Sequence, residues 1–208
     1  MQKEETAFET LERFAENTKR KIEKFEHMYS QSSLQKIPQT KRWVTIEDNR
    51  KAFFFGYSSS SMSTSEFSLI SGIAIPIEMH RKDFSLKMSQ KNILDSFNFF
   101  KKNSKLDDRE LDKEIVLKST DMARCTSLLL DQKVKQQLLT TVKQTLGLNL
   151  EINSCQLLGI PSLKNENIIC LYKKEWIFDP QLIETLFELA HTIHDKLMEK
   201  RIVTTNEG

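Results

Sequence analysis

Mostly apolar side chains recur at steps of three and four residues along the N-terminal part of the chain. They form one helical stripe made of Phe8, Leu11, Ala15, Thr18, Ile22, Phe25 and Tyr29, widened by Phe14 and Met28. No Pro or Gly interrupts residues 6–30, and Thr6-Ala7-Phe8-Glu9 has the form of a capping box at a helix start. The pattern predicts one long amphipathic helix within residues 1–30.

Three interpretations of this stripe stay open. It packs on the protein's own body, it self-associates as a short zipper, or it lies on a membrane surface. A helix of about 25 residues is about 37 Å long, so it can extend beyond a domain of this size. The acidic first half of the helix would be repelled by anionic lipid, so the membrane is not favoured. The candidate interaction residues are Phe8, Leu11, Phe14, Ile22 and Phe25.

After the N-terminal stripe, the spacing of apolar residues changes from helical to alternating. Runs rich in β-formers and broken by turn-formers occupy residues 43–46, 52–57, 67–77 and 84–88. We expect consecutive antiparallel strands. The run at 67–77 is predicted to lie at the centre of the sheet, because one set of its alternate residues is nearly all apolar. The serine-rich stretch 58–65 is expected to be a hairpin loop.

The C-terminal half alternates short strands with capped helices. Residues 114–118 favour a strand, and Asp121 and Asp131 can cap two helices, the second ending before Gly147. Brief strands are expected at 148–152, 155–159 and 167–172. Asp179-Pro180 opens a last helix. That helix is predicted to bury Leu182, Leu186, Leu189, Ile193 and Leu197.

Together these elements predict an α+β fold. It is mainly an antiparallel sheet packed with C-terminal helices and preceded by the long N-terminal amphipathic helix. We expect the amphipathic helix in residues 1–30, a linker containing Pro38 in 31–41, one α+β domain in 42–200 and a flexible tail in 201–208.

Composition narrows the class of protein. The 208 residues, 38% of them apolar, suffice for one core, and a typical domain size of about 150 residues favours one domain. A net charge of +2 gives no broad reason to bind nucleic acid. Cys125, Cys155 and Cys170 form no CxxC pair, so we expect free thiols in a reducing compartment. With no secretory signal and no membrane-spanning stretch, the sequence predicts a soluble cytoplasmic protein.

Candidate chemistry is sparse. His191 and His194 lie close together on the last helix, and with ligands from another segment they could hold a metal ion. They do not form an HExxH motif, so a solvated polar face is favoured over a metal site. The glycines are too far apart for a GxGxxG or P-loop motif, and no GxSxG elbow occurs. We therefore assign no catalytic residue and no cofactor.

A series of short motifs runs through the residues from 67 to 197. They are Ile73-Ala74-Ile75-Pro76-Ile77, Phe84-Ser85-Leu86, Leu111-Asp112 leading into 115–121, Leu128-Leu129-Leu130 and Trp176-Ile177-Phe178-Asp179-Pro180. In this order they resemble a bacterial domain of unknown function that often follows predicted membrane helices. The resemblance implies a bacterial source and supplies no catalytic residues.

The favoured function is a non-catalytic protein–protein interaction or scaffold module. The N-terminal stripe or an open sheet edge would be its contact surface, with a protein partner or a second copy in a homodimer. One alternative is a small-ligand-binding or hydrolytic domain with a pocket between the sheet and the helices. Another is a peripheral membrane protein held by the N-terminal helix.

Overall fold

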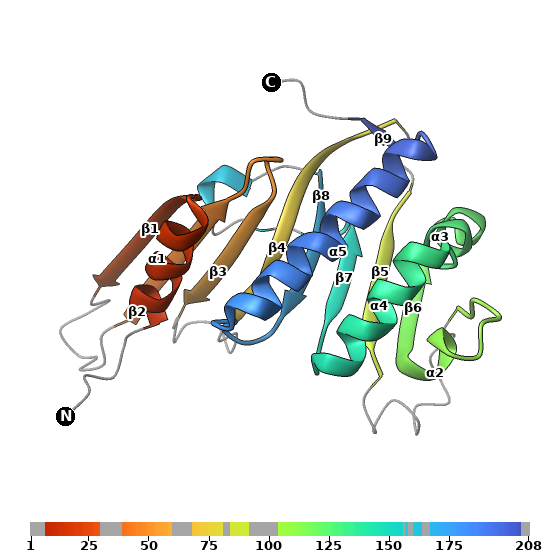
Figure 1. Cartoon of the computed structure of the whole chain (residues 1–208), viewed down its shortest axis with the longest axis horizontal. Helices are drawn as coiled ribbons and strands as arrows, with labels where there is room; N and C mark the ends of the chain where they lie inside the picture. Colours follow the sequence, from red (N-terminus) through yellow and green to blue (C-terminus); the bar gives the residue numbers. More distant parts are fainter. Residues whose placement is uncertain are drawn as a thin grey trace.

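A computed structural model describes residues 7–29, 39–59, 68–80, 84–91, 104–155, 157, 160–163 and 167–204. In these residues the chain forms an antiparallel sheet of nine strands with the α-helices on one face (Figure 1). The strands are β1 (Lys21–Tyr29), β2 (Gln39–Glu47), β3 (Phe53–Ser59), β4 (Ser68–Met79), β5 (Leu86–Gln90), β6 (Ile115–Ser119), β7 (Asn149–Ile152), β8 (Asn167–Lys173) and β9 (Val203–Thr204). The helices are α1 (Ala7–Thr18), α2 (Leu111–Glu114), α3 (Met122–Leu129), α4 (Gln132–Gln144), α5 (Pro180–Glu199) and the 3₁₀ turn η2 (Pro161–Leu163). The predicted α+β class is confirmed.

The strands follow the order β1-β2-β3-β4-β8-β7-β5-β6, and β9 pairs with the end of β4. The expected consecutive order therefore holds for β2, β3 and β4 but not for β5, and β4 is central as predicted. β5 does not follow β4 in the sheet, because β4 is apolar on both faces and pairs with β8, where Ile73 lies opposite the equally buried Leu171. β5 alternates buried Leu86 with exposed Lys87, which suits a position nearer the far edge.

The predicted long N-terminal helix is wrong, because α1 has 12 residues and ends at Thr18. The Thr18 hydroxyl donates to Phe14 O at 2.8 Å, and Lys19 takes a left-handed conformation with φ of 54°. Arg20 N then donates to Ala15 O at 2.9 Å. These features form a Schellman-type helix end, with lysine at the position that glycine usually occupies.

Residues after this helix end form β1 instead of continuing the helix. β1 pairs with β2 along its whole length, with Phe25 opposite Trp43. Ile22 points to the helix-covered face and packs against the core, whereas Phe25 lies on the opposite face. The spacing of Ile22, Phe25 and Tyr29 fits a helix, but pairing with β2 decides the conformation.

Capping residues place the C-terminal helices where the sequence predicts them. The side chains of Asp121, Asp131 and Asp179 accept hydrogen bonds from the first turns of α3, α4 and α5. Gly147 follows α4 with φ of 77°. The predicted apolar stripe of α5 is buried, apart from the partly buried Leu182.

The main core lies between the sheet and the helices. Figure 1 shows α1, α5 and α4 crossing the same face of the sheet, with α1 near β1 and β2 and α4 toward β5 and β6. Ile73, Ile75 and Ile77 of β4 point into this core and are buried with Leu186 and Ile193 of α5. Burial of this face joins α1 and β1 to the same core as the rest of the sheet.

A second buried cluster lies on the reverse face of the sheet. Its members are Phe55, Ala74, Leu157, Ile160, Leu163, Ile168 and Cys170. Here the predicted strand at 155–159 is wrong, since the described residues of that segment belong to no strand. Asn153 adopts a left-handed φ of 53° directly after β7. The chain therefore leaves the sheet and buries its apolar side chains against it.

Parts of the predicted linker and tail also fall in strands. The linker ends in β2, which begins at Gln39, and Val203–Thr204 of the tail form β9. Residues 31–38 and 205–208 lie outside the described part of the chain, as do most of the predicted loop 58–65 and residues 156, 158 and 159.

Candidate functional site

The outer edge of β1 ends the sheet on one side. Within the described residues no strand pairs with this edge. The side chains of residues 21–27 are exposed, apart from partly buried Ile22. Phe25 is 41% exposed, which is high for a phenylalanine in a sheet.

The backbone of β1 presents alternate residues to this edge. Asp48 N donates across the hairpin between β2 and β3, and hydrogen-bonded pairs recur at every second residue of an antiparallel ladder. Counting along the two registers, Trp43 and Phe25 form a hydrogen-bonded pair of β2 and β1. Lys24 and Glu26, on either side of Phe25, therefore direct their N–H and C=O groups outward.

An aromatic row crosses the reverse face next to this edge. It consists of Phe25, Trp43 and Tyr57, which lie opposite one another on β1, β2 and β3. The rings of Phe25 and Trp43 stack with centroids 6.0 Å apart and an interplanar angle of 15°. Lys41 Nζ lies 6.0 Å from the Tyr57 ring centroid. The aromatic row thus joins the second cluster, against which Trp43 and Tyr57 pack, to the exposed Phe25.

The helix-covered side of β1 carries opposite charges. Lys24 forms an ion pair with Glu12 of α1, and Glu26 Oε1 lies 3.7 Å from Arg42 Nε on β2. These side chains are at least one-third exposed. The charged groups of Lys24 and Glu26 are therefore accessible from the β1 edge.

The structure divides the predicted interaction residues into two groups. Leu11 and Phe14 are buried under α1, and Phe8 and Ile22 are partly buried against the same core. Phe8 meets the Trp176 ring edge-on, with centroids 6.0 Å apart. Phe25 alone of the five is exposed and lies at the open edge.

Arg20 fixes the start of β1 to α5. Its guanidinium makes two hydrogen bonds to the Glu184 carboxylate, at 2.6 and 2.8 Å. It also lies over the rings of Phe14 and Phe187, 5.3 and 4.5 Å from their centroids. This combination of a bidentate ion pair and two cation–π contacts holds α1, β1 and α5 together.

The two histidines of the predicted metal site have separate surroundings. His191 Nε2 lies 2.5 Å from Oδ2 of Asp48. The other carboxylate oxygen of Asp48, Oδ1, accepts hydrogen bonds from the amides of Arg50 and Ala52. His194 Nδ1 lies 3.7 Å from Asp195 Oδ1, and burial lowers the pKa of His194. In the described residues no three His, Cys, Asp or Glu side chains gather into a metal-binding group.

Asp48 and His191 therefore act as a structural tie. The carboxylate closes the turn between β2 and β3 through its amide contacts, and the imidazole joins that turn to α5. The ring of His191 also stacks on Phe187 at 6.3 Å. These contacts position the hairpin that carries the aromatic row.

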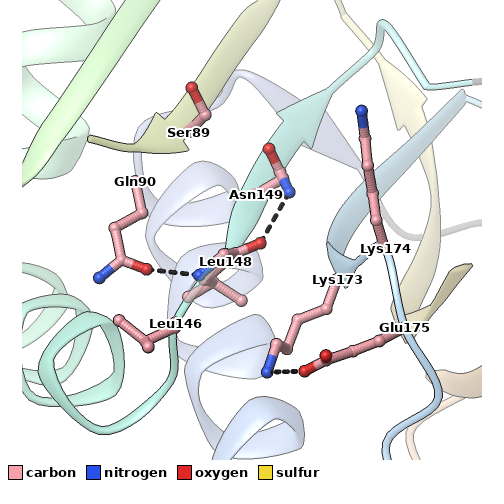
Figure 2. A pocket seen from close by; sticks show the side chains of 9 residues that line it. Ser89, Gln90, Leu146, Leu148, Asn149, Lys173, Lys174 and Glu175 are labelled. Atoms are coloured by element: carbon pink, nitrogen blue, oxygen red, sulfur yellow. Dashed lines mark hydrogen bonds and ion pairs between the residues drawn. The ribbon is translucent and has the colours of Figure 1, made fainter. Parts of the chain in front are cut away.

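A hollow of about 400 Å³ lies at the ends of β5, β7 and β8 (Figure 2). Gln90 Oε1 accepts from Gly147 N at 2.6 Å, and its Nε2 donates to Val142 O at 2.9 Å. Asn149 Nδ2 donates to Gly147 O at 2.9 Å, and Lys173 pairs with Glu175. The contacts of Gln90 and Asn149 with Gly147 fix the turn from α4 into β7, so this turn forms one wall of the hollow.

Sequence reasoning missed the aromatic row and the Asp48–His191 pair. The sequence predicts strands at Trp43 and Tyr57, but the alignment of these residues with Phe25 depends on the registers of three strands. Asp48 and His191 are 143 residues apart in the chain. A partial signal for the aromatic row does exist, since Trp43 and Tyr57 occupy two consecutive β-rich segments.

Comparison with known proteins adds no assignment: no family model, curated protein or solved structure matches this chain. The resemblance to a bacterial domain of unknown function stays a prediction. No helix in the described part of the chain is long and apolar enough to cross a membrane.

Proposed function

We propose that this chain is a non-catalytic protein–protein interaction module that assembles by adding a strand to the outer edge of β1. The observation that carries the proposal is the open edge itself, with Phe25 exposed beside outward-facing backbone groups. Unpaired N–H and C=O groups of an edge strand are a template for another strand. Exposed aromatic side chains supply the apolar contact that such pairing needs.

The strand that best fits this edge is β1 of a second copy. An antiparallel pair with its two-fold axis at Phe25 places Lys24 opposite Glu26 of the partner subunit, and the same pair recurs across the axis. Glu23 then lies opposite His27 of the partner subunit. The outward backbone groups of Lys24 and Glu26 form hydrogen-bonded pairs in this register.

Neighbouring registers are disfavoured by charge. A shift of two positions in one direction places Lys24 opposite its own copy, and a shift in the other direction does the same for Glu26. Like charges directly opposite each other destabilise a strand pair. The charges of β1 therefore select the register centred on Phe25.

Charge reversal tests both the edge and the partner. We expect the wild-type chain to form a dimer in sedimentation equilibrium. Lys24→Glu and Glu26→Lys should each weaken the dimer about tenfold, because each replaces two attractive pairs with two repulsive ones. The double variant K24E/E26K should return the affinity close to that of the wild type.

The double variant also separates assembly from folding. Lys24 and Glu26 have their own intramolecular partners, Glu12 and Arg42, which the double variant does not restore. A purely intramolecular role would therefore make the double variant less stable than either single one, with no recovery of a dimer. A wild-type chain that stays monomeric at high concentration would overturn the proposal.

A further inference from the structure

Two of the three cysteines lie together on the reverse face of the sheet. Cys170 in β8 is fully buried, and Cys155 follows β7 and is partly exposed. Cys155 packs against the second cluster, which contains Cys170, and a hydrogen bond links the two thiols. Cys125 is a residue of α3 and is buried in the main core, on the opposite face of the sheet.

Cys155 lies where the chain leaves β7 and turns over the second cluster. Asn153 N donates to Ile168 O at 3.0 Å, which is the last contact of the β7–β8 ladder. Ser154 Oγ lies 3.2 Å from Leu86 O. Beyond Cys155, the described residues Leu157, Ile160 and Leu163 are buried against the reverse face. A covalent bond at Cys155 would hold the start of this part of the chain to β8.

The surroundings make the two thiols unequal. The hydrogen bond from Cys170 and the positive charge of Lys87 lower the pKa of Cys155, against the opposing effects of burial and the Glu151 carboxylate. Burial raises the pKa of Cys170 well above its ordinary value. Cys155 is therefore the thiol that ionises first, and it is also the one that solvent reaches.

Neighbouring groups stabilise the negative charge of Glu151 through hydrogen bonds and an ion pair. Its carboxylate accepts from the Tyr172 hydroxyl at 2.8 Å and from Ser154 Oγ at 2.9 Å. Lys87 Nζ lies 3.1 Å from the same group. These contacts hold the carboxylate in place beside Cys155 and reduce its repulsion of a thiolate.

We propose that Cys155 and Cys170 form a peroxide-sensitive dithiol, which closes to a disulfide and fixes the start of the chain that leaves β7 to β8. The oxidant is a hydroperoxide, and Cys155 is the attacking group. The inference does not depend on assembly through β1.

The reaction balances with one peroxide for two thiols. The Cys155 thiolate attacks one oxygen of hydrogen peroxide and breaks the O–O bond, giving a sulfenic acid and hydroxide. The hydroxide takes up the proton that Cys155 released and becomes water. The Cys170 sulfur then attacks the sulfenic sulfur and breaks the S–O bond. The departing hydroxide takes the Cys170 proton, so that the products are one disulfide and two waters.

Intact mass and peptide mapping test this pairing on the folded chain. With one equivalent of hydrogen peroxide, we expect the mass to fall by about 2 Da, the two hydrogens lost on forming a disulfide. Trypsin digestion without reductant should yield one linked species joining residues 144–164 to residues 165–173. Because the disulfide closes a short loop, the melting temperature should rise by about 5 °C and return on reduction.

Single variants identify the order of attack. Cys170→Ser should stop at a Cys155 sulfenic acid, about 16 Da heavier and trapped by dimedone. Cys155→Ser should leave the mass unchanged at the same peroxide concentration, and Cys125→Ser, the matched control, should still form the linked peptide. The proposal fails if the wild-type chain gains oxygen at Cys155 with no linked peptide. It also fails if Cys155 reacts no faster than Cys125.

Discussion

The two edges of the sheet are protected in different ways. At the β6 edge, Ser104 bridges to Leu117, and Ser104 N donates to Leu117 O at 3.2 Å. Asp112 Oδ1 accepts from Leu106 N at 3.0 Å, which holds residues 104–106 in place along the β6 edge. At the β1 edge the described residues supply no such cover, and alternating charges flank Phe25 instead.

The difference separates blocking an edge from selecting a partner for it. A segment of chain that covers an edge prevents any strand from pairing there. Charges prevent most pairings but admit a strand with the opposite charge sequence. The strand β1 is its own complement when it is reversed about Phe25, so its charges favour the symmetric pairing centred on that residue over the neighbouring registers.

The largest expected effect on the dimer comes from a lysine in the edge strand β1, compared with a lysine in the opposite edge strand β6. Phe25→Lys should weaken the dimer at least about 100-fold, because two lysines meet at the two-fold axis and the aromatic contact is lost. Val116→Lys on β6 faces the same side of the sheet and should leave the dimer unchanged. Sedimentation equilibrium measures both, and equal effects of the two variants would remove the distinction between the edges.

The next largest effect should come from removing the contacts that hold the start of β1 to α5. Arg20→Ala removes the ion pair with Glu184 and both ring contacts, so we expect a loss of about 2 kcal/mol in the free energy of unfolding. Solvent weakens this ion pair, because the Glu184 side chain is 40% exposed. Arg20→Lys keeps the charge but loses the bidentate geometry, and should recover less than half of that loss in urea melts. Full recovery by lysine would show that charge alone matters.

The hairpin next to β1 should respond to acid. Burial disfavours the charged form of Asp48, but hydrogen bonds from His191 and from the Ala52 and Arg50 amides outweigh it, so the pKa of Asp48 lies below 3.8. A lowered carboxyl pKa stabilises the fold above pH 3.8, and this stabilisation is lost as the pH falls through the folded-state value. Asp48→Asn should therefore cost about 1.5 kcal/mol at pH 7, with a smaller difference at pH about 3. Urea melts at both pH values check this, and a constant difference would contradict it.

The smallest expected effect lies at the covered β6 edge. Asp112→Ala removes the hydrogen bond that holds the Leu106 amide, and should lower the free energy of unfolding by about 1 kcal/mol. Hydrogen exchange should become faster at Leu106 and at the outer backbone of β6, while exposed Lys113→Ala leaves both unchanged. No change in exchange would show that other contacts keep the edge covered.

Much of the fold follows from local signals in the sequence. Alternating apolar residues predict β3 and β4, and aspartate caps predict α3, α4 and α5, because each signal acts within a few residues of where it lies. The end of α1 was missed because Lys19 takes the left-handed conformation that usually identifies a glycine. The helix-like spacing of Ile22 and Phe25 then hid a strand whose conformation depends on β2.

The candidate site was less predictable than the fold. Phe25 was selected for its place on a helical stripe, whereas its exposure results from lying in an edge strand. The aromatic row and the thiol pair depend on strand register and on the path of the segment after β7, neither of which has a local signal. Cys155 and Cys170, 15 residues apart, gave no recognisable spacing for the same reason.

The pairing of β4 with β8 has a consequence for how the protein is made. Ile73 and its partner Leu171 are separated by 98 residues, so the inner edge of β4 stays open until most of the chain has been synthesised. At about 5–20 residues per second this interval lasts roughly 5–20 s. A nascent chain thus displays β4, which is apolar on both faces, for seconds before the centre of the sheet can close.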